Sequence, residues 1–149
     1  IAKLGILRVQ VANVIEGTTR GARALVLVHG DADIAVDLDR IHMVNCDTEQ
    51  RHATVQLPQP HADRPRVNHE QTRIYELQKT GLAAINPFAD PRQDLLADCM
   101  RAAQAEVEKS VADKRFIAQA KDQTELLLFG FYREIGWTVA VEWVDADAS

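Results

Sequence analysis

The chain has 149 residues and a formal net charge of −5, with 46% hydrophobic and 26% charged residues. This length suits one domain over residues 1–149, and the composition is typical of a folded globular protein rather than a disordered one. A mildly acidic chain lacks the basic surface that binds nucleic acid or an anionic membrane, so we expect neither as a direct partner.

Alternating hydrophobic residues predict four strands in the first part of the chain. The first covers residues 7–15 (LRVQVANVI), and residues 16–21 (EGTTRG) have the composition of a turn. The second covers residues 22–30 and is expected to end at Gly30, which makes Asp31 a turn residue. The third begins with the alternating stretch 31–39 (DADIAVDLD) and runs to residue 44, and the fourth covers residues 53–58. Their short spacing favours an antiparallel meander.

The middle of the chain is rich in proline. The segment 58–66 (PQPHADRPR) holds three prolines, which remove backbone donors and exclude a central strand, so this segment is extended or irregular. We favour a strand at Arg73–Gln78, although Asn68 could instead cap a short helix that ends at Gly81. Residues 82–91 are expected to form a loop.

The last part of the chain predicts two helices and a strand. Asp90 is a candidate N-cap with Pro91 at the first helical position, and Asp113 offers a second N-cap after a break. Gly136 stands where a left-handed C-terminal glycine ends the second helix. The apolar faces are Leu96, Met100, Ala103, Val107 and Val111 in the first helix, and Phe116, Ile117, Ala120, Thr124, Leu127, Leu128, Phe131 and Ile135 in the second. In the final strand Trp137, Val139, Val141 and Trp143 share one face.

This order of elements defines the expected fold class. Strands, then two helices, then a strand indicate an α+β fold: an antiparallel meander sheet, two helices packed on one face, and a final C-terminal strand.

Four carboxylates in the stretch 31–39 are the candidate metal ligands: Asp31, Asp33, Asp37 and Asp39. Alternate side chains of a strand start nearly 7 Å apart, and the stretch lacks the internal glycine and distal glutamate of a calcium loop. A strand running into D-x-D resembles the nucleophile strand of haloacid-dehalogenase-type phosphatases, but the strand-after-strand order disfavours that parallel fold. We therefore favour the solvent-facing side of an ordinary strand, with metal or phosphoryl binding as the alternative.

The remaining reactive side chains do not form a recognisable catalytic pattern. His42, Cys46 and His52 could converge at a hairpin end, but a zinc site prefers four ligands in tight pairs. The sequence has no nucleophile-elbow, P-loop or dinucleotide-binding motif. Cys99 is expected to pack inside the first helix, and a Cys46–Cys99 disulfide is left open. The sequence predicts no catalytic residue and no cofactor.

Three ordered motifs resemble those of the domain of unknown function 4230 family. The first is matched by Gly30, Val36, Asp37, Leu38, Arg40 and Ile41, the second by Leu57, Pro58 and Pro60, and the third by Ile135 and Gly136. The chain departs from the family pattern at Ala35, where the family has glycine, and at Asp39, where it has serine. Asp37 belongs to the first motif, and we expect its carboxylate to hydrogen-bond backbone near the strand end.

The resemblance implies a location but no chemistry. Such proteins are bacterial and membrane-anchored, with an N-terminal helix expected upstream of residue 1 and this domain outside the cytoplasm, in the periplasm or at the cell surface. No activity, cofactor or catalytic residue comes with the family. The leading hypothesis is a non-enzymatic, membrane-proximal domain that binds a protein partner or assembles with itself.

Overall fold

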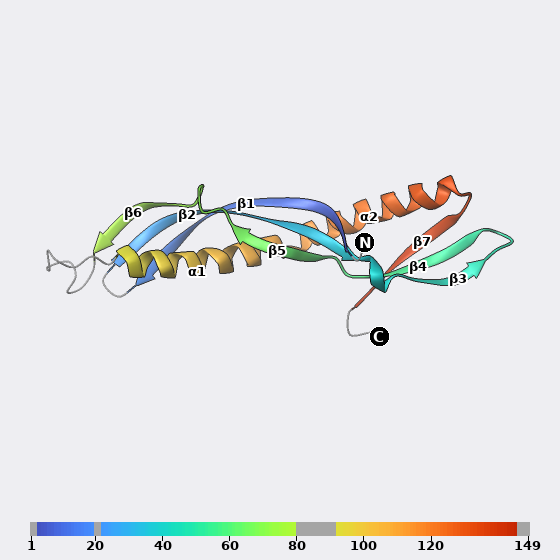
Figure 1. Cartoon of the computed structure of the whole chain (residues 1–149), viewed down its shortest axis with the longest axis horizontal. Coiled ribbons are helices and arrows are strands. Elements are labelled where there is room, and N and C mark those ends of the chain that lie inside the picture. The colour runs from blue at the N-terminus through green and yellow to red at the C-terminus, as the bar shows by residue number, and fades with distance from the viewer. Residues whose placement is uncertain (1–2, 20–21, 80–91, 146–149) are drawn as a thin grey trace. The chain divides into compact units, whose positions relative to one another are not determined.

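The computed structural model describes residues 3–19, 22–79 and 92–145. Their elements, shown in Figure 1, are β1 (Lys3–Thr19), β2 (Ala22–Asp37), the short 3-10 helix η1 (Leu38–Arg40), β3 (His42–Asp47), β4 (His52–Pro58), β5 (His61–Val67), β6 (Arg73–Lys79), α1 (Arg92–Val111), α2 (Lys114–Glu134) and β7 (Thr138–Val144). This order confirms the predicted α+β class, with an antiparallel sheet, two helices and a C-terminal strand.

The strands divide between two sheets. One has the order β1-β2-β5, with β6 also pairing with β2, and the other has the order β3-β4-β7. Within the second sheet β3 and β4 are antiparallel, whereas β4 and β7 are parallel, with Ala53 opposite Val139. Parallel neighbours require a long connection, which here includes both helices.

The chain forms two compact units, each built from separated segments. Unit 1 comprises Ile1–Arg8, Asp33–Asp63 and Ala112–Ser149, and unit 2 comprises Val9–Ala32 and Arg64–Val111. The single-domain organisation stays a prediction.

The core of unit 1 lies on the sheet β3-β4-β7. Its buried residues are Val36, Ala53, Val55, Leu57 and Val139. The partly buried residues packed against it include Leu128 and Tyr132 of α2, and Trp137, Val141 and Trp143 of the final strand region. The predicted inward face of the final strand is therefore confirmed.

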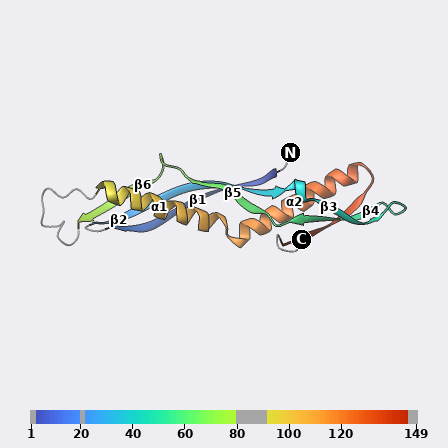
Figure 2. The same ribbon diagram turned by 60° about the horizontal axis from the view of Figure 1, so that its bottom comes forward.

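The core of unit 2 lies between its strands and α1. From β2 it takes alternate residues such as Ala24, Val26 and Val28, and Figures 1 and 2 show α1 running along these strands. The buried stripe of α1 is Leu95, Cys99, Ala103, Val107 and Val111. The prediction was right for the last three residues and wrong for Leu96, which is 49% exposed, and for Met100, which is only half-buried.

Two glycines explain which stripe of α1 faces the strands. A Cβ atom placed on Gly17 would lie 2.3 Å from the Sγ atom of Cys99. A Cβ atom on Gly30 would lie 2.3 Å from Cγ2 of Val107 and 2.8 Å from the carbonyl oxygen of Arg66. Side chains cannot fit at these distances, so glycine is what allows α1 to approach the strands closely. Gly30 of the family-like motif thus has a packing role.

The first two strands are longer than the sequence predicts. β1 continues to Thr19 through most of the expected turn, and β2 passes through Gly30 without ending. The turn assignment of Asp31 was therefore wrong. β2 continues through Gly30 because the alternation of its side chains is not interrupted there. Every even-numbered residue from Ala22 to Val36 is buried.

The predictions for the proline-rich middle agree with the structure. β5 contains Pro65 and lies at the end of the path β1-β2-β5, where a missing backbone donor is tolerated. The favoured strand at residues 73–78 is confirmed by β6, and the helix alternative is wrong. Asn68 instead caps a tight turn, since its side-chain oxygen accepts hydrogen bonds from the amides of Glu70 and Gln71, both at 3.1 Å.

The second helix begins and ends as predicted. The Asp113 carboxylate accepts a hydrogen bond from the Arg115 amide at 2.8 Å, which makes Asp113 the N-cap. Gly136 follows the helix with φ of 82°, a left-handed conformation that favours glycine. The predictions for Gly81, for the loop 82–91 and for Asp90 and Pro91 lie outside the described residues.

Candidate interaction surface

The inward side of α2 is held by a small number of contacts. Ala120 and Thr124 are fully buried, and the Thr124 hydroxyl donates a 2.7 Å hydrogen bond to the Ala120 carbonyl. The Trp143 ring Nε1 donates to the Glu125 carboxylate at 2.9 Å, while the Lys121 ammonium lies 5.8 Å from the centre of the same ring. The Glu125–Trp143 hydrogen bond and the Lys121–Trp143 contact join α2 to β7, beside which it lies in Figure 1.

The C-terminal half of α2 is apolar on the sides that face away from the core. Leu126 is 71% exposed, Leu127 57% and Phe131 64%, although residues 116–135 were expected to turn one apolar face inward. That expectation was wrong for Leu127, Phe131 and Ile135. We call the exposed set the apolar α2 surface: Leu126, Leu127, Phe129, Phe131 and Ile135.

The apolar α2 surface continues toward β3. The Phe131 ring meets Tyr132 edge to face, with ring centres 5.3 Å apart, and the Tyr132 hydroxyl donates to the Met43 Sδ atom at 3.9 Å. Met43 is itself exposed on β3. A helix that is apolar all round normally has both sides covered, so this surface is a candidate site for another molecule.

Sequence reasoning missed this surface because it assigned Leu127, Phe131 and Ile135 to the inward face and gave Leu126 and Phe129 no role. The signal was nevertheless present in the segment 126–135 (LLLFGFYREI), where apolar residues occupy all sides of the helix. One helix face can bury only three or four positions in every seven, so some of these side chains had to face outward.

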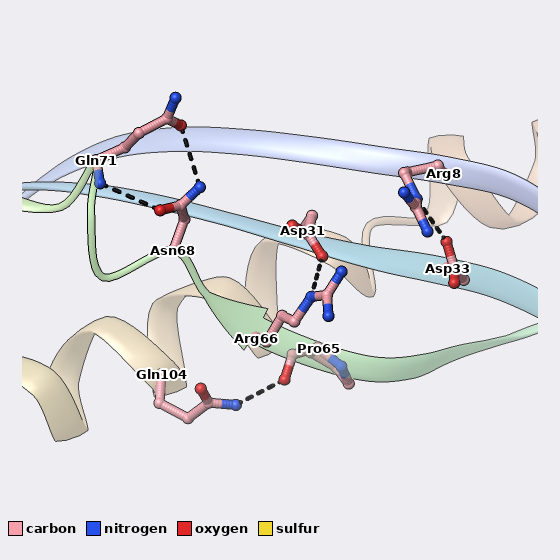
Figure 3. Close-up of polar contacts among 8 residues, drawn as sticks. All are labelled: Arg8, Asp31, Asp33, Pro65, Arg66, Asn68, Gln71 and Gln104. Carbon is pink, nitrogen blue, oxygen red and sulfur yellow. Dashed lines mark hydrogen bonds and ion pairs between the residues drawn. The ribbon is translucent and has the colours of Figure 1, made fainter.

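Two aspartates of the acidic strand are paired with arginines, as Figure 3 shows. In unit 2 the Arg66 Nε atom donates to the Asp31 carboxylate at 2.7 Å. In unit 1 the Arg8 Nε atom donates to the Asp33 carboxylate at 3.0 Å. Both pairs are partly exposed to solvent, which agrees with the solvent-facing side of a strand.

Asp37 and Asp39 differ from the other two. The Asp37 Oδ1 atom is buried and finds no hydrogen-bond partner within the described chain, and its side chain does not cap η1. The expected hydrogen bond to the backbone is therefore not formed by this oxygen. Asp39 lies exposed in η1. In the ranges 3–19, 22–79 and 92–145, no three His, Cys, Asp or Glu side chains are grouped to hold a metal ion.

The histidine and cysteine candidates remain separate from one another. His42 pairs with Gln56 and His52 pairs with Asp47, so the two histidines occupy opposite ends of the β3–β4 hairpin. Cys46 is an exposed free thiol. Cys99 is a buried free thiol, and burial, with a smaller effect of the Asp98 charge, raises its pKa above the ordinary value. A raised pKa disfavours the nucleophilic thiolate.

Polar contacts attach α1 to the strands of unit 2. The Gln104 side chain donates to the Pro65 carbonyl at 3.0 Å, as drawn in Figure 3. The Asn13 amide donates to Glu106 at 2.8 Å and to the Ser110 hydroxyl at 2.9 Å. These bonds, together with the two close glycine contacts, give α1 a structural role.

Several residues of the family-like motifs contribute to packing. Leu57, Pro58 and Pro60 are buried, and Leu38 packs against the core of unit 1. With Gly30 and Gly136 they contribute to close packing and to the end of α2.

These features define an α+β domain whose motifs maintain packing and whose second helix carries an exposed apolar surface. The chain belongs to the family described as protein of unknown function (DUF4230), which matches residues 1–143. Comparison with curated proteins found no match, and comparison with solved structures found none either. None of the helices in the described part of the chain has the length and apolar character needed to cross a bilayer.

Proposed function

We propose that this domain is a non-enzymatic interaction module that binds a protein through the apolar α2 surface. The observation that carries the proposal is the exposure of five large apolar side chains on a helix whose other side is already packed. Fully burying one such side chain contributes roughly 1.5–3 kcal/mol. A few of them can therefore supply the binding energy of a specific complex.

The proposal includes a membrane-proximal location outside the cytoplasm, which rests on the family resemblance. Protease treatment of intact cells or spheroplasts tests it, because a domain outside the cytoplasmic membrane is digested before that membrane is broken. Protection until lysis would contradict this part of the proposal.

Site-specific photo-crosslinking tests the binding surface. A photo-reactive phenylalanine analogue replaces Phe131, and the matched control carries it at Leu96, an exposed apolar residue of α1 in unit 2. We expect one defined adduct from position 131, identified by mass spectrometry and lost on Leu127→Ser, and none from position 96. Equal adducts from both positions, or none from position 131, would count against the apolar α2 surface.

A second candidate function is ligand binding at the acidic strand through Asp31, Asp33, Asp37 and Asp39. It is supported by the buried and unpaired Oδ1 atom of Asp37, since such an atom costs stability unless something satisfies it. Calorimetric titration with Ca²⁺, Mg²⁺ and Mn²⁺, and with inorganic phosphate, tests it on the wild type and on Asp37→Asn. Binding heat that disappears in the variant supports this function, and titrations without heat exclude it.

A further inference from the structure

The outermost stripe of α2 contains two apolar residues between two opposite charges. Asp122, Leu126, Phe129 and Arg133 are all exposed, and they follow one another at intervals of four, three and four residues. At about 100° per residue these intervals keep the four side chains within one narrow sector of the helix. The Asp122 and Arg133 side chains form no ion pair with any described residue.

The stripe is complementary to a second copy of itself that runs in the opposite direction. The intervals read the same in both directions, and reversal exchanges the acidic end with the basic end. If a second α2 lies antiparallel on the first, Asp122 of each copy faces Arg133 of the other, and Leu126 of each faces Phe129 of the other. A two-fold axis produces such an arrangement, because each contact then occurs twice.

We propose that α2 mediates self-association of this chain, by antiparallel packing of the stripe Asp122–Leu126–Phe129–Arg133 against a second copy. This inference rests on the proposed function, in which the apolar α2 surface binds a protein, and it assigns one part of that surface, around Leu126 and Phe129, to a second copy of the chain. Charge complementarity selects the second copy over a lipid surface, since the stripe carries one charge of each sign rather than a basic cluster.

Gly130 supports the close approach of another helix. It lies one turn after Leu126, and, apart from its own stretch of helix backbone, no atom of the described residues lies within 4 Å of the position that its Cβ would occupy. Glycine inside a helix costs about 1 kcal/mol relative to alanine, so a reason outside the helix is needed. No residue in the described part of the chain packs against the Gly130 Cβ position, whereas a second helix packed at 8–10 Å between axes would use this space.

Leu127 and Phe131 lie outside this contact. They are separated from the stripe by more than a quarter turn of the helix, so the antiparallel pair leaves them exposed. This separation provides a matched control, because Leu126 and Leu127 are adjacent, chemically identical and both exposed.

Sedimentation equilibrium of the 149-residue chain tests the inference. We expect Leu126→Lys to abolish the dimer and Leu127→Lys to leave it intact. Asp122→Arg places an arginine opposite Arg133 of the other copy at both ends of the contact, and it should weaken dimerisation about tenfold or more. The double variant Asp122→Arg with Arg133→Asp exchanges the two charges and should restore dimerisation. Circular dichroism and thermal unfolding verify that each variant is folded. A monomeric wild type, or a dimer equally weakened by Leu127→Lys, would overturn the inference.

Thiol crosslinking determines the direction of packing. In a Cys46→Ser background, separately prepared Asp122→Cys and Arg133→Cys chains are mixed and treated with a bismaleimide spanning about 10 Å. Antiparallel packing yields mainly mixed 122–133 products, whereas parallel packing yields 122–122 and 133–133 products and overturns the inference. A monomeric chain that still gives the Phe131-position adduct with another protein would overturn only this inference. Loss of that adduct as well would overturn the proposed function too.

Discussion

The contact between Gly17 and Cys99 allows the packing of α1 in unit 2 to be tested by a double-mutant cycle. Gly17→Ala adds a Cβ atom 2.3 Å from the Cys99 Sγ atom, whereas carbon and sulfur atoms in ordinary contact are separated by well over 3 Å. Overpacking of this kind costs about 1–3 kcal/mol. The φ angle of Gly17 is not in the left-handed region, so steric conflict with Cys99 is the main effect.

The second substitution removes the conflicting atom. Cys99→Ala alone costs roughly 1 kcal/mol, because it deletes one buried sulfur atom and leaves a small cavity. In the double variant the nearest atoms to the new methyl group are the Cβ of residue 99 at 3.7 Å and Val26 Cγ2 at 3.8 Å, which are normal contacts. The new methyl group also fills part of the cavity. We therefore expect the double variant to be at least as stable as Cys99→Ala alone.

Urea unfolding followed by circular dichroism measures the free energy of unfolding of all four proteins. The coupling energy between the two sites should be about 1–3 kcal/mol in favour of the double variant. A parallel cycle with Gly30→Ala and Val107→Ala serves as the contrast, because the Arg66 carbonyl oxygen at 2.8 Å remains in conflict after Val107 is shortened. Additive effects at Gly17 and Cys99, or a neutral Gly17→Ala, would refute the close-contact explanation.

Four further predictions concern α2 and the thiols. Gly136→Ala should lower the free energy of unfolding by about 1–2 kcal/mol, because alanine is strained at the Gly136 φ of 82°. Gly130→Ala should raise the free energy of unfolding of the monomer by up to about 1 kcal/mol, because alanine is a better helix former than glycine. Thermal unfolding at low protein concentration measures both effects. Iodoacetamide at pH 8 should label the exposed Cys46 and leave Cys99 unlabelled until urea unfolds the chain, as read by mass spectrometry. The pKa of Asp113 is lowered by side-chain and backbone hydrogen bonds from the arginine two residues later. Asp113→Ala should therefore reduce stability at pH 7, with a difference from wild type that narrows as the pH falls below about 3.9.

The local features of the fold were predictable because they depend on residues close together in the sequence. Alternating apolar residues located the strands, and Asp113 and Gly136 marked the ends of α2, since a cap needs only its own helix. The stripe of α1 was predictable only in part. The predicted stripe with Leu96 and Met100 and the observed stripe with Leu95 and Cys99 continue through the same three residues, Ala103, Val107 and Val111. Which stripe faces the strands depends on Gly17 and Gly30, which are distant in the sequence.

The pairing of strands and the exposure of α2 were not predictable for a related reason. An alternating pattern shows that a strand has a buried face but does not identify its neighbour, so the parallel pairing of β4 with β7 was missed. Similarly, Leu127 and Phe131 are hydrophobic whether the surface that covers them belongs to the same chain or to another molecule. The sequence shows that these side chains are hydrophobic but not which surface buries them.

The β4–β7 pairing has a consequence for synthesis on the ribosome. The strand β7, which pairs with β4, follows both helices in the chain, so Ala53 lacks its strand partner until Val139 has been synthesised. Until residues 138–144 have left the ribosomal tunnel, one edge of β4 has unpaired backbone groups beside the apolar Ala53, Val55 and Leu57. Translation therefore includes an interval of exposure to aggregation or chaperone binding, and a nascent chain stalled before β7 should be the form most dependent on such help.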